Sequence, residues 1–331
     1  MVTMGAAVMA LMVCGCTDDS AASETDLGET LFPGNHQSRA GAVVETGTSV
    51  RVILTTATDQ VSGNITKTGD EEWSSTARVK KNVQYFIHGY MPADAATGST
   101  LEAQPSGIAN GAILSLNGVD AVTQTDLSVI VGVQDLTNST DAFDVRMGQF
   151  GYLGKDRGKN FAHLLMYRIQ SSIHFELLID NGYSQLRTIK LKKATLTAEQ
   201  GNKCDIMVNM RANNSGSNPI TTINYIPTEG TTDVDIFEDE EGVALSTDVP
   251  LTFNVNFVPI LRNYLTLNVT YDVYDSKGNF IHSRTASNKL GSALPALLHG
   301  EQTTLTLTVR PTYLYVLSDP DLDNPTIGIT N

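Results

Sequence analysis

Three aspartates near the C-terminus, Asp319, Asp321 and Asp323, come nearest in type and spacing to a metal-binding motif. Carboxylates at every second position can converge on a hard cation such as Ca²⁺, as in the first half of an EF-hand loop. Asn324 stands where that loop needs glycine, and no glutamate follows to complete the ligand set. The alternative to a calcium site is a solvated turn that ends a strand. We favour the turn and predict no metal site.

Catalytic motifs are missing from the sequence. It contains no G-x-S-x-G, no H-E-x-x-H, no Walker loop and no G-x-G-x-x-G. The six histidines show no ligand-like spacing, and His88 and His282 lie in strand-like runs, where a hydrogen-bonded histidine is the usual explanation. Carboxylates are numerous, but nothing singles out a pair for glycoside hydrolysis. The sequence therefore predicts a protein that is not an enzyme and uses no cofactor.

Covalent lipid attachment is the one chemistry for which the sequence carries a specific signal. An apolar run over residues 4–13 ends in Val13-Cys14-Gly15-Cys16, and it is too short to span a bilayer. A small residue before Cys16 and an aliphatic residue three before it resemble a bacterial lipobox. Cys16 would then be acylated and become the first residue of the mature chain, anchored in a membrane by its lipid. The alternative is ordinary signal cleavage, with Cys14 and Cys16 incidental.

A polar segment follows this signal and separates it from the first strand. Residues 17–48 are rich in Ser, Thr, Gly and acidic residues, which is typical of a mobile leader. Residues 32–34 (Phe-Pro-Gly) are expected to form a turn. Arg39, followed by Ala40, is a basic residue in a flexible segment, which favours cleavage by a protease between the two.

Composition limits the partners. The chain has 331 residues and a formal net charge of −14, so nucleic acid and anionic lipid surfaces would repel it. After the signal region only Cys204 remains, which excludes an internal disulfide and a thiolate metal cluster. Cys204 is expected to be a small buried hydrophobe.

Hydrophobic alternation with a period of two predicts strands along most of the chain. In residues 265–274, for example, alternate positions are Leu, Leu, Val, Tyr and Val, and the others are mainly Thr, Asn and Asp. Such a strand buries one face. Other strands are expected at 49–57, 80–91, 112–116, 127–133, 145–152, 164–178, 186–191, 204–210, 221–226, 251–258, 280–285 and 303–316.

Turn signals separate these strands. Residues 275–279 (Asp-Ser-Lys-Gly-Asn) predict a hairpin turn, and turns are also expected at Gly63-Asn64 and over the acidic residues Asp233, Asp235 and 238–241. Many short strands without a βαβ rhythm predict an all-β protein of antiparallel sandwiches. We expect a signal peptide at 1–15, a leader at 16–48, an N-terminal β-sandwich at 49–153 and a C-terminal β-sandwich at 154–331, with 154–159 as a linker.

Several hydrophobic blocks look like those of one family. Residues 85–92 (YFIHGYMP), 124–131 (QTDLSVIV), 161–177 (FAHLLMYRIQSSIHFEL) and 309–319 (VRPTYLYVLSD) occur in the order found in the Bacteroidetes fimbrillin family, which the chain resembles from about residue 50 onward. The resemblance implies two transthyretin-like β-sandwiches, a lipoprotein precursor, outer-membrane export and removal of the leader after a basic residue, for which Arg39 is the match.

Polymerisation by strand donation would follow from removal of a leader strand. A sheet that lacks an edge strand exposes backbone groups and core pockets that an extended segment can fill. The C-terminal residues 325–330, with Ile327 and Ile329 on one face, are the candidate donor; the alternative is that they complete their own domain.

Two functions therefore stand at this point. One is a structural and adhesive fimbrial subunit, whose partners would be other subunits, a host protein or glycan, and the outer membrane through Cys16. The other is a monomeric surface glycan-binding lipoprotein, for which Trp73 is the one tryptophan available to stack on sugar.

Overall fold

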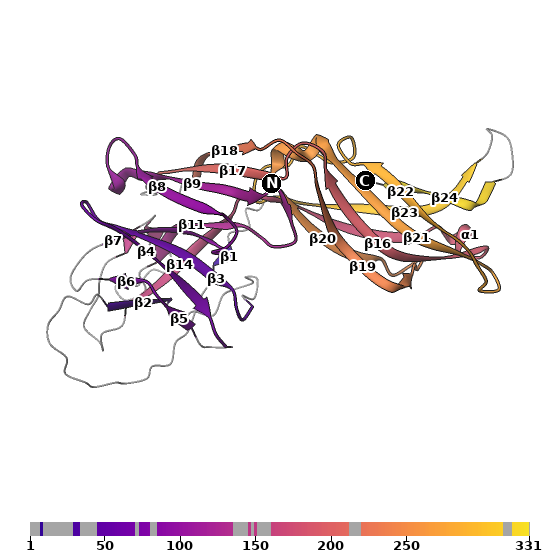
Figure 1. Cartoon of the computed structure of the whole chain (residues 1–331), viewed down its shortest axis with the longest axis horizontal. Coiled ribbons are helices and arrows are strands. Elements are labelled where there is room, and N and C mark those ends of the chain that lie inside the picture. The colour runs from indigo at the N-terminus through magenta and orange to yellow at the C-terminus, as the bar shows by residue number, and fades with distance from the viewer. Residues whose placement is uncertain are drawn as a thin grey trace. The chain divides into compact units, whose positions relative to one another are not determined.

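The computed structural model describes residues 7–8, 29–33, 45–69, 73–79, 85–134, 145–146, 149–150, 160–211, 220–313 and 320–330. The chain divides into two compact units (Figure 1). Unit 1 consists of Met1–Val119, Asp126–Ile169 and Asp205–Ile226, and unit 2 of Asp120–Thr125, Gln170–Cys204 and Pro227–Asn331. Each unit is thus assembled from separate stretches of the chain.

A large mixed sheet forms one layer of unit 1. Its hydrogen-bonded order is β5-β4-β3-β7-β11-β14-β2-β6, and β1, β12 and β13 pair at its sides. The strands are β1 (Ala7–Val8), β2 (Glu29–Pro33), β3 (Ser49–Thr55), β4 (Gln60–Lys67), β5 (Trp73–Ser75), β6 (Arg78–Val79), β7 (Tyr85–Met91), β11 (Ser128–Gln134), β12 (Val145–Arg146), β13 (Gln149–Phe150) and β14 (Asn160–Arg168).

A second sheet of unit 1 has the order β18-β17-β9-β8 and lies beside the first in Figure 1. Its strands are β8 (Gly98–Ala103), β9 (Gly111–Asp120), β17 (Lys203–Arg211) and β18 (Ile220–Pro227), and the short helix η1 (Ile108–Asn110) leads into β9. Alternate residues of β9 and β17 are buried, as expected for strands that cover one side of a core. Cys204, on β17, is fully buried, as predicted.

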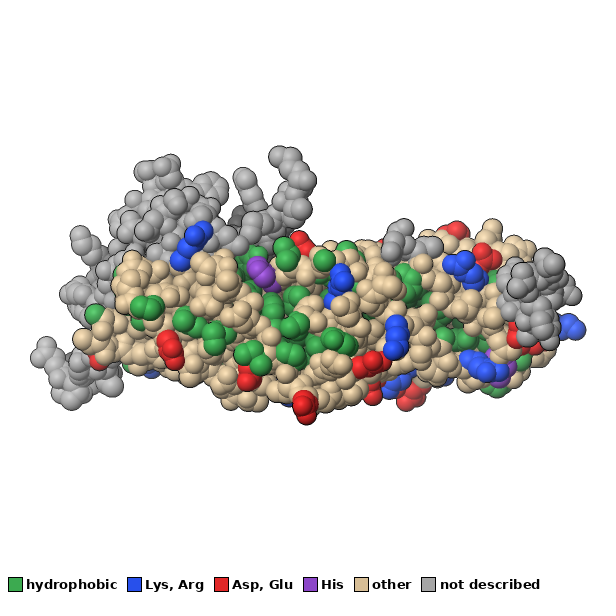
Figure 2. All heavy atoms as spheres, turned by 90° about the horizontal axis from the view of Figure 1, so that it is seen from above, with side chains coloured by type: hydrophobic (Ala, Val, Ile, Leu, Met, Phe, Trp, Pro, Cys, Tyr) green, Lys and Arg blue, Asp and Glu red, His purple; other side chains and the backbone are tan. Residues whose placement is uncertain are grey.

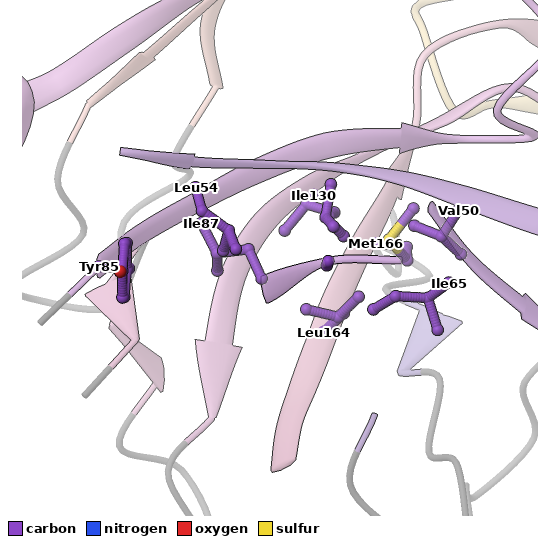
Figure 3. Packing of buried hydrophobic residues seen from close by; sticks show 10 residues of the cluster. Val50, Leu54, Ile65, Tyr85, Ile87, Ile130, Leu164 and Met166 are labelled. Atoms are coloured by element: carbon purple, nitrogen blue, oxygen red, sulfur yellow. The ribbon is translucent and has the colours of Figure 1, made fainter. Parts of the chain in front are cut away.

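One hydrophobic cluster in unit 1 comes from a single face of the large sheet (Figure 3). Pairing places Leu54 of β3 beside Ile87 of β7, and Ile130 of β11 beside Met166 of β14, so these side chains point the same way. Each of the four is no more than 3% exposed. The cluster consists of Val50, Val52, Leu54, Ile65, Ala77, Tyr85, Ile87, Ile130, Leu164 and Met166.

Two glycines in this sheet allow backbones to approach closely. A Cβ at Gly63 would lie 2.5 Å from the backbone nitrogen of Ala77, and one at Gly89 would lie 1.9 Å from the carbonyl oxygen of Arg51. No larger residue fits at either position without moving the backbone. Gly63-Asn64, predicted as a turn, therefore lies inside β4, and the prediction is wrong because this glycine serves packing.

Unit 2 contains a sheet with the order β10-β20-β15-β23-β24. Its strands are β10 (Val122–Thr123), β20 (Leu251–Phe257), β15 (Ser171–Ile179), β23 (Gln302–Tyr313) and β24 (Pro320–Thr330). β15 and β23 run parallel, and the other neighbouring pairs are antiparallel. The aromatic rings of Phe175 and Phe253 pack across β15 and β20 with centroids 5.2 Å apart.

The second sheet of unit 2, called sheet F, has the order β19-β16-β21-β22 and is antiparallel throughout. It is built from β16 (Arg187–Ala198), β19 (Thr232–Ala244), β21 (Leu265–Asp275) and β22 (Phe280–Lys289). Two short helices, α1 (Asn181–Ser184) and η2 (Pro259–Tyr264), precede β16 and β21. Leu265, Leu267, Val269 and Val273 of β21 are all at most 1% exposed, so the predicted alternation is confirmed.

Turn chemistry behaves as expected at the hairpin between β21 and β22. The carboxylate of Asp275 accepts hydrogen bonds from the backbone N–H groups of Lys277 and Asn279, both at 2.8 Å. Gly278 has φ of 83°, a conformation that glycine adopts without strain. The predicted hairpin is confirmed.

Other strand predictions need correction. The stretch 164–178 is two strands, β14 and β15, instead of one. Residues 32 and 33, expected in a turn, belong to β2. The acidic residues Asp233, Asp235 and 238–241, expected in a turn, lie in β19. Their pairing is interrupted after Glu238, where Asp239 accepts hydrogen bonds from the N–H groups of Glu241 and Gly242.

The predicted fold class is confirmed: the described chain is nearly all β, and its layered sheets are mainly antiparallel. The predicted boundary between residues 153 and 154, like the linker 154–159, lies outside the described residues and stays a prediction.

His88 of β7 makes stability depend on pH. Its side chain is 1% exposed, and neither ring nitrogen has a hydrogen-bond partner within the described part of the chain. Burial lowers the pKa of His88 to about 4. Because the unfolded chain takes up a proton near pH 6.5 and the folded chain does not, stability is lost as the pH falls from 6.5 to 4.

We predict that His88→Gln reduces this pH dependence, which amounts to about 3 kcal/mol for a shift of this size. Urea unfolding at pH 7 and at pH 4.5 measures it as the difference between the two free energies of unfolding. His174→Gln is the matched control, because His174 is partly exposed and bonded to Asn254. An unchanged difference in His88→Gln contradicts the prediction.

Candidate functional site

The pairing of β14 is the first place where the structure brings together segments that the sequence marked as functional. β11 pairs along one side of β14, with Met166 opposite Ile130. The other side carries β2, whose Leu31, Phe32 and Pro33 pair with residues 160–162, and β1, whose Ala7 and Val8 pair with Met166 and Leu165. Both segments come from residues that precede Arg39.

β14 is also part of the hydrophobic cluster of unit 1. Leu164 is 2% exposed and Met166 is 3% exposed, and both contribute to the cluster in Figure 3. A strand that is paired on both sides and buried along one face is not an ordinary outer edge. Loss of β1 and β2 would leave the N–H and C=O groups on one side of β14 without these partners, next to the core.

The C-terminal strand β24 is the second such place. It pairs antiparallel with β23 at the end of its sheet, with Ile327 opposite Val309 and Ile329 opposite Leu307. Ile327 is 4% exposed, and Ile329 is partly buried. In this structure residues 325–330 therefore complete the sheet of their own unit. Their role as a donor strand stays a prediction.

A bulge divides β24 and is held from several sides. Pairing with β23 jumps from Asp321 to Pro325, so residues 322–324 lie outside the ladder. The hydroxyl of Tyr183 donates to the carbonyl oxygen of Leu322 at 2.7 Å, and that of Tyr271 donates to the carbonyl oxygen of Pro325 at 3.2 Å. These bonds tie the bulge to α1 and β21.

An ion pair and an internal turn complete this anchor. Arg187 donates to the carboxylate of Asp323 from Nε at 3.0 Å and from Nη2 at 2.6 Å. Asp321 Oδ1 accepts the backbone N–H groups of Asp323 and Asn324. The hydrogen bond from the Asn324 side chain lowers the pKa of Asp321, so this carboxylate remains charged at neutral pH.

Burial raises the pKa of Tyr183 above the ordinary value for tyrosine, and it does the same for Tyr271. Both hydroxyls therefore remain protonated donors at any physiological pH.

Two aspartates of the calcium-loop-like spacing near the C-terminus serve this anchor and bind its own groups. Asp321 caps a turn and Asp323 pairs with Arg187, while Asp319 lies outside the described residues. In the described ranges no group of three or more His, Cys, Asp or Glu residues is arranged to hold a metal ion.

Several predicted site residues cannot be placed. Cys16, Arg39 and Ala40 lie outside the described residues, so lipidation and cleavage stay predictions. Trp73 is the first residue of β5 and pairs with Lys67. The part of the chain that the structure covers includes no helix both long and apolar enough to span a membrane.

Sequence reasoning missed Tyr183, Arg187 and Tyr271, because the residues that they contact are more than 50 positions away. Asp180 did carry a signal: its side chain caps α1 by accepting the N–H of Tyr183 at 3.0 Å, which is a common role for aspartate before a helix.

Solved structures give the only similarities. No protein-family model matches the chain, and no curated protein matches it. A candidate cell adhesion protein from Bacteroides fragilis is similar over 98% of this chain and 96% of its own, at 12% identity and a TM-score of 0.41. A candidate cell adhesion protein from Bacteroides uniformis is similar over 87% of this chain and 93% of its own, at 11% identity and a TM-score of 0.40.

A third candidate cell adhesion protein, from Bacteroides ovatus, is similar over 92% of this chain and 94% of its own. The identity is 11% and the TM-score is 0.35. Scores and identities this low assign no family or function to the chain.

Removal of one anchor bond is expected to loosen β24. We predict that Tyr183→Phe, which deletes the hydroxyl that donates to Leu322, speeds amide hydrogen exchange in residues 326–330 by about two- to tenfold, since such a bond contributes about 0.5–1.5 kcal/mol. Tyr264→Phe, a change at a more exposed tyrosine of unit 2, is the control and should leave exchange unchanged. Equal exchange in the Tyr183→Phe protein and the wild type would count against the anchor.

Proposed function

We propose that this protein is a structural and adhesive subunit of a cell-surface fimbria, exported as a lipoprotein precursor through Cys16. It is assembled by strand donation after cleavage near Arg39. The observation that carries the proposal is the pairing of the leader strand β2 with β14, a strand of the hydrophobic cluster of unit 1. The resemblance of the hydrophobic blocks to the fimbrillin family points the same way.

The leader strand β2 precedes Arg39 in the chain and pairs with β14. β1 lies within the expected signal peptide, so cleavage before Cys16 would already remove it. Cleavage between Arg39 and Ala40 then breaks the covalent connection of β2 to unit 1. β2 is five residues long, and its ladders with β14 and β6 are short, so few backbone hydrogen bonds hold it once it is cut free.

An exposed β14 would be a template for a strand from another subunit. Its backbone groups need hydrogen-bond partners, and its neighbours Leu164 and Met166 lie in the hydrophobic cluster. An incoming extended segment with apolar residues at alternate positions satisfies both needs. Residues 325–330 have this pattern, with Ile327 and Ile329 on one face.

Two features govern how this donor is released. Its last six residues pair with one strand, β23, at the end of their sheet, whereas the residues from the bulge to Pro325 are tied down by Tyr183, Arg187 and Tyr271. Residues 326–330 can therefore leave β23 while the bulge remains attached. A strand hinged at the bulge reaches a neighbour without unfolding the rest of unit 2.

Cleavage is tested at Arg39. We predict that Arg39→Gln keeps the leader attached and blocks the ladder of multimers seen when surface-sheared material is run on a gel without boiling. In the wild type, mass spectrometry should find an N-terminus at Ala40. Arg262→Gln, in η2 of unit 2, is the control and should polymerise normally.

Ladders from Arg39→Gln equal to those of the wild type would overturn assembly by leader removal. A single band from the wild type, with the leader retained, would instead support the monomeric glycan-binding lipoprotein.

Lipidation is tested at the cysteines. Cys16→Ser is expected to abolish incorporation of labelled palmitate and to remove the precursor from the outer-membrane fraction, because the acylated thiol is its anchor. Cys14→Ser is the matched control, two residues away, and should label as the wild type does. Palmitate on the Cys16→Ser protein would contradict the assignment.

A further inference from the structure

The two edges of sheet F carry opposite charges. β19, at one end, contains Asp233, Asp235, Glu238, Asp239, Glu240 and Glu241, with no Lys or Arg. β22, at the other end, contains Arg284 and Lys289, together with His282, and no Asp or Glu.

Charges elsewhere are mixed. On the face drawn in Figure 2, acidic and basic side chains are interspersed. Single-sign segments such as β19 and β22 therefore differ from that surface. Asp233, Asp235 and Glu238 are exposed on β19, as are Arg284 and Lys289 on β22, so each edge presents its charge to the solvent.

Strand direction allows the two edges to meet. Each neighbouring pair in sheet F is antiparallel, so β19 and β22 run in opposite directions. A second copy moved sideways without rotation would bring its β19 beside β22 of the first, also antiparallel. The alternation of the sheet would continue from one copy to the next.

The register makes the contact chemically matched. Across the sheet, Asp233, Thr197, Thr266 and Lys289 form one row. Extended by one strand, this row places Lys289 beside Asp233 of the next copy. The next two rows end in Asp235 and Ser287 and in Glu238 and Thr285, so they place a hydroxyl beside a carboxylate.

We propose that copies of this protein associate through the edges of sheet F. The basic edge strand β22 of one copy lies against the acidic edge strand β19 of the next. The partner is a second copy of this chain, and the interface is heterologous, so that it repeats without closing. This association needs neither leader removal nor strand donation and is therefore independent of the proposed function.

Groups that already face these edges limit the contact to side chains. Lys193 pairs with Asp235 at 2.5 Å, and Glu199 lies 3.9 Å from Lys289. Gln124 donates to the backbone carbonyl of Asp235 at 2.7 Å, so continuous backbone pairing is blocked there. Asp321 lies close enough to Arg284 for the guanidinium to help lower the pKa of that carboxyl group.

The competing explanation is protection. Charged residues and bulges on edge strands prevent sheets from pairing, and the interruption after Glu238 in β19 is such a bulge. To prevent pairing with another sheet, an edge strand needs only charge. To bind a second copy, the two edge strands need opposite charges at positions that face each other. Reversing the charges of β19 in one variant and of β22 in another, and then mixing the two variants, distinguishes the two explanations.

The test uses two variants of the full chain, each carrying Arg39→Gln so that leader removal plays no part. The first is Asp233→Lys with Glu238→Lys, which puts lysines on β19 at the rows that end in Lys289 and Thr285 of β22. The second is Arg284→Glu with Lys289→Glu, which makes both edges acidic. Sedimentation velocity over a range of concentrations measures self-association, and circular dichroism verifies folding.

We expect the parent to associate and each variant alone to associate at least about tenfold more weakly. An equimolar mixture should recover association, because the lysine at position 233 of one variant then lies beside the glutamate at position 289 of the other. Asp59→Lys with Glu102→Lys, on exposed positions of unit 1, is the control and should behave as the parent. If a reversed variant misfolds, Asp233→Asn and Lys289→Gln replace the reversals, and each should weaken association by severalfold.

A parent that stays monomeric at all concentrations overturns the proposal. The proposal is also overturned if either variant alone associates as strongly as the parent. It is overturned as well if the mixture of the two variants associates no more strongly than each variant alone.

Discussion

Unsatisfied backbone groups at the ends of sheets are the constraint on which the rest of this structure depends. Every sheet has two outer strands, and each leaves N–H and C=O groups that another chain can pair with. In unit 1 the leader strand β2 covers one side of β14. In unit 2 the outer strand β24 is tied down at its bulge, and the outer strands β19 and β22 carry charges of opposite sign.

The sequence predicted the strands whose burial is one-sided, because alternation with a period of two is a direct result of strand geometry. β21 is the clearest case, with its leucines and valines fully buried and its threonines facing out. β4 was missed because Gly63 predicted a turn, whereas in the structure it allows close packing of two backbones. β19 was missed because its run of carboxylates also predicted a turn. Both strands depend on what lies beside them in space.

The candidate site shows the same division. The apolar pattern at Ile327 and Ile329 is local, so the sequence marked this segment as an extended strand. Its partner β23, and its anchors Tyr183, Arg187 and Tyr271, come from distant parts of the chain. No spacing rule connects Asp323 with Arg187, 136 positions earlier. The tertiary pairing had to be seen before the aspartates of the half calcium loop could be understood as parts of an anchor.

The two kinds of edge differ in how reversible their contacts are. A donated strand exchanges a row of backbone hydrogen bonds and buries apolar side chains, so separation of two subunits would require the whole ladder to break. A charged edge makes a few exposed ion pairs, each contributing about 0–1 kcal/mol, and its contacts form and break readily. A surface polymer needs strong bonds along its length and benefits from weak ones between neighbours. The edges of β14 and β24 suit the first purpose, and those of β19 and β22 suit the second.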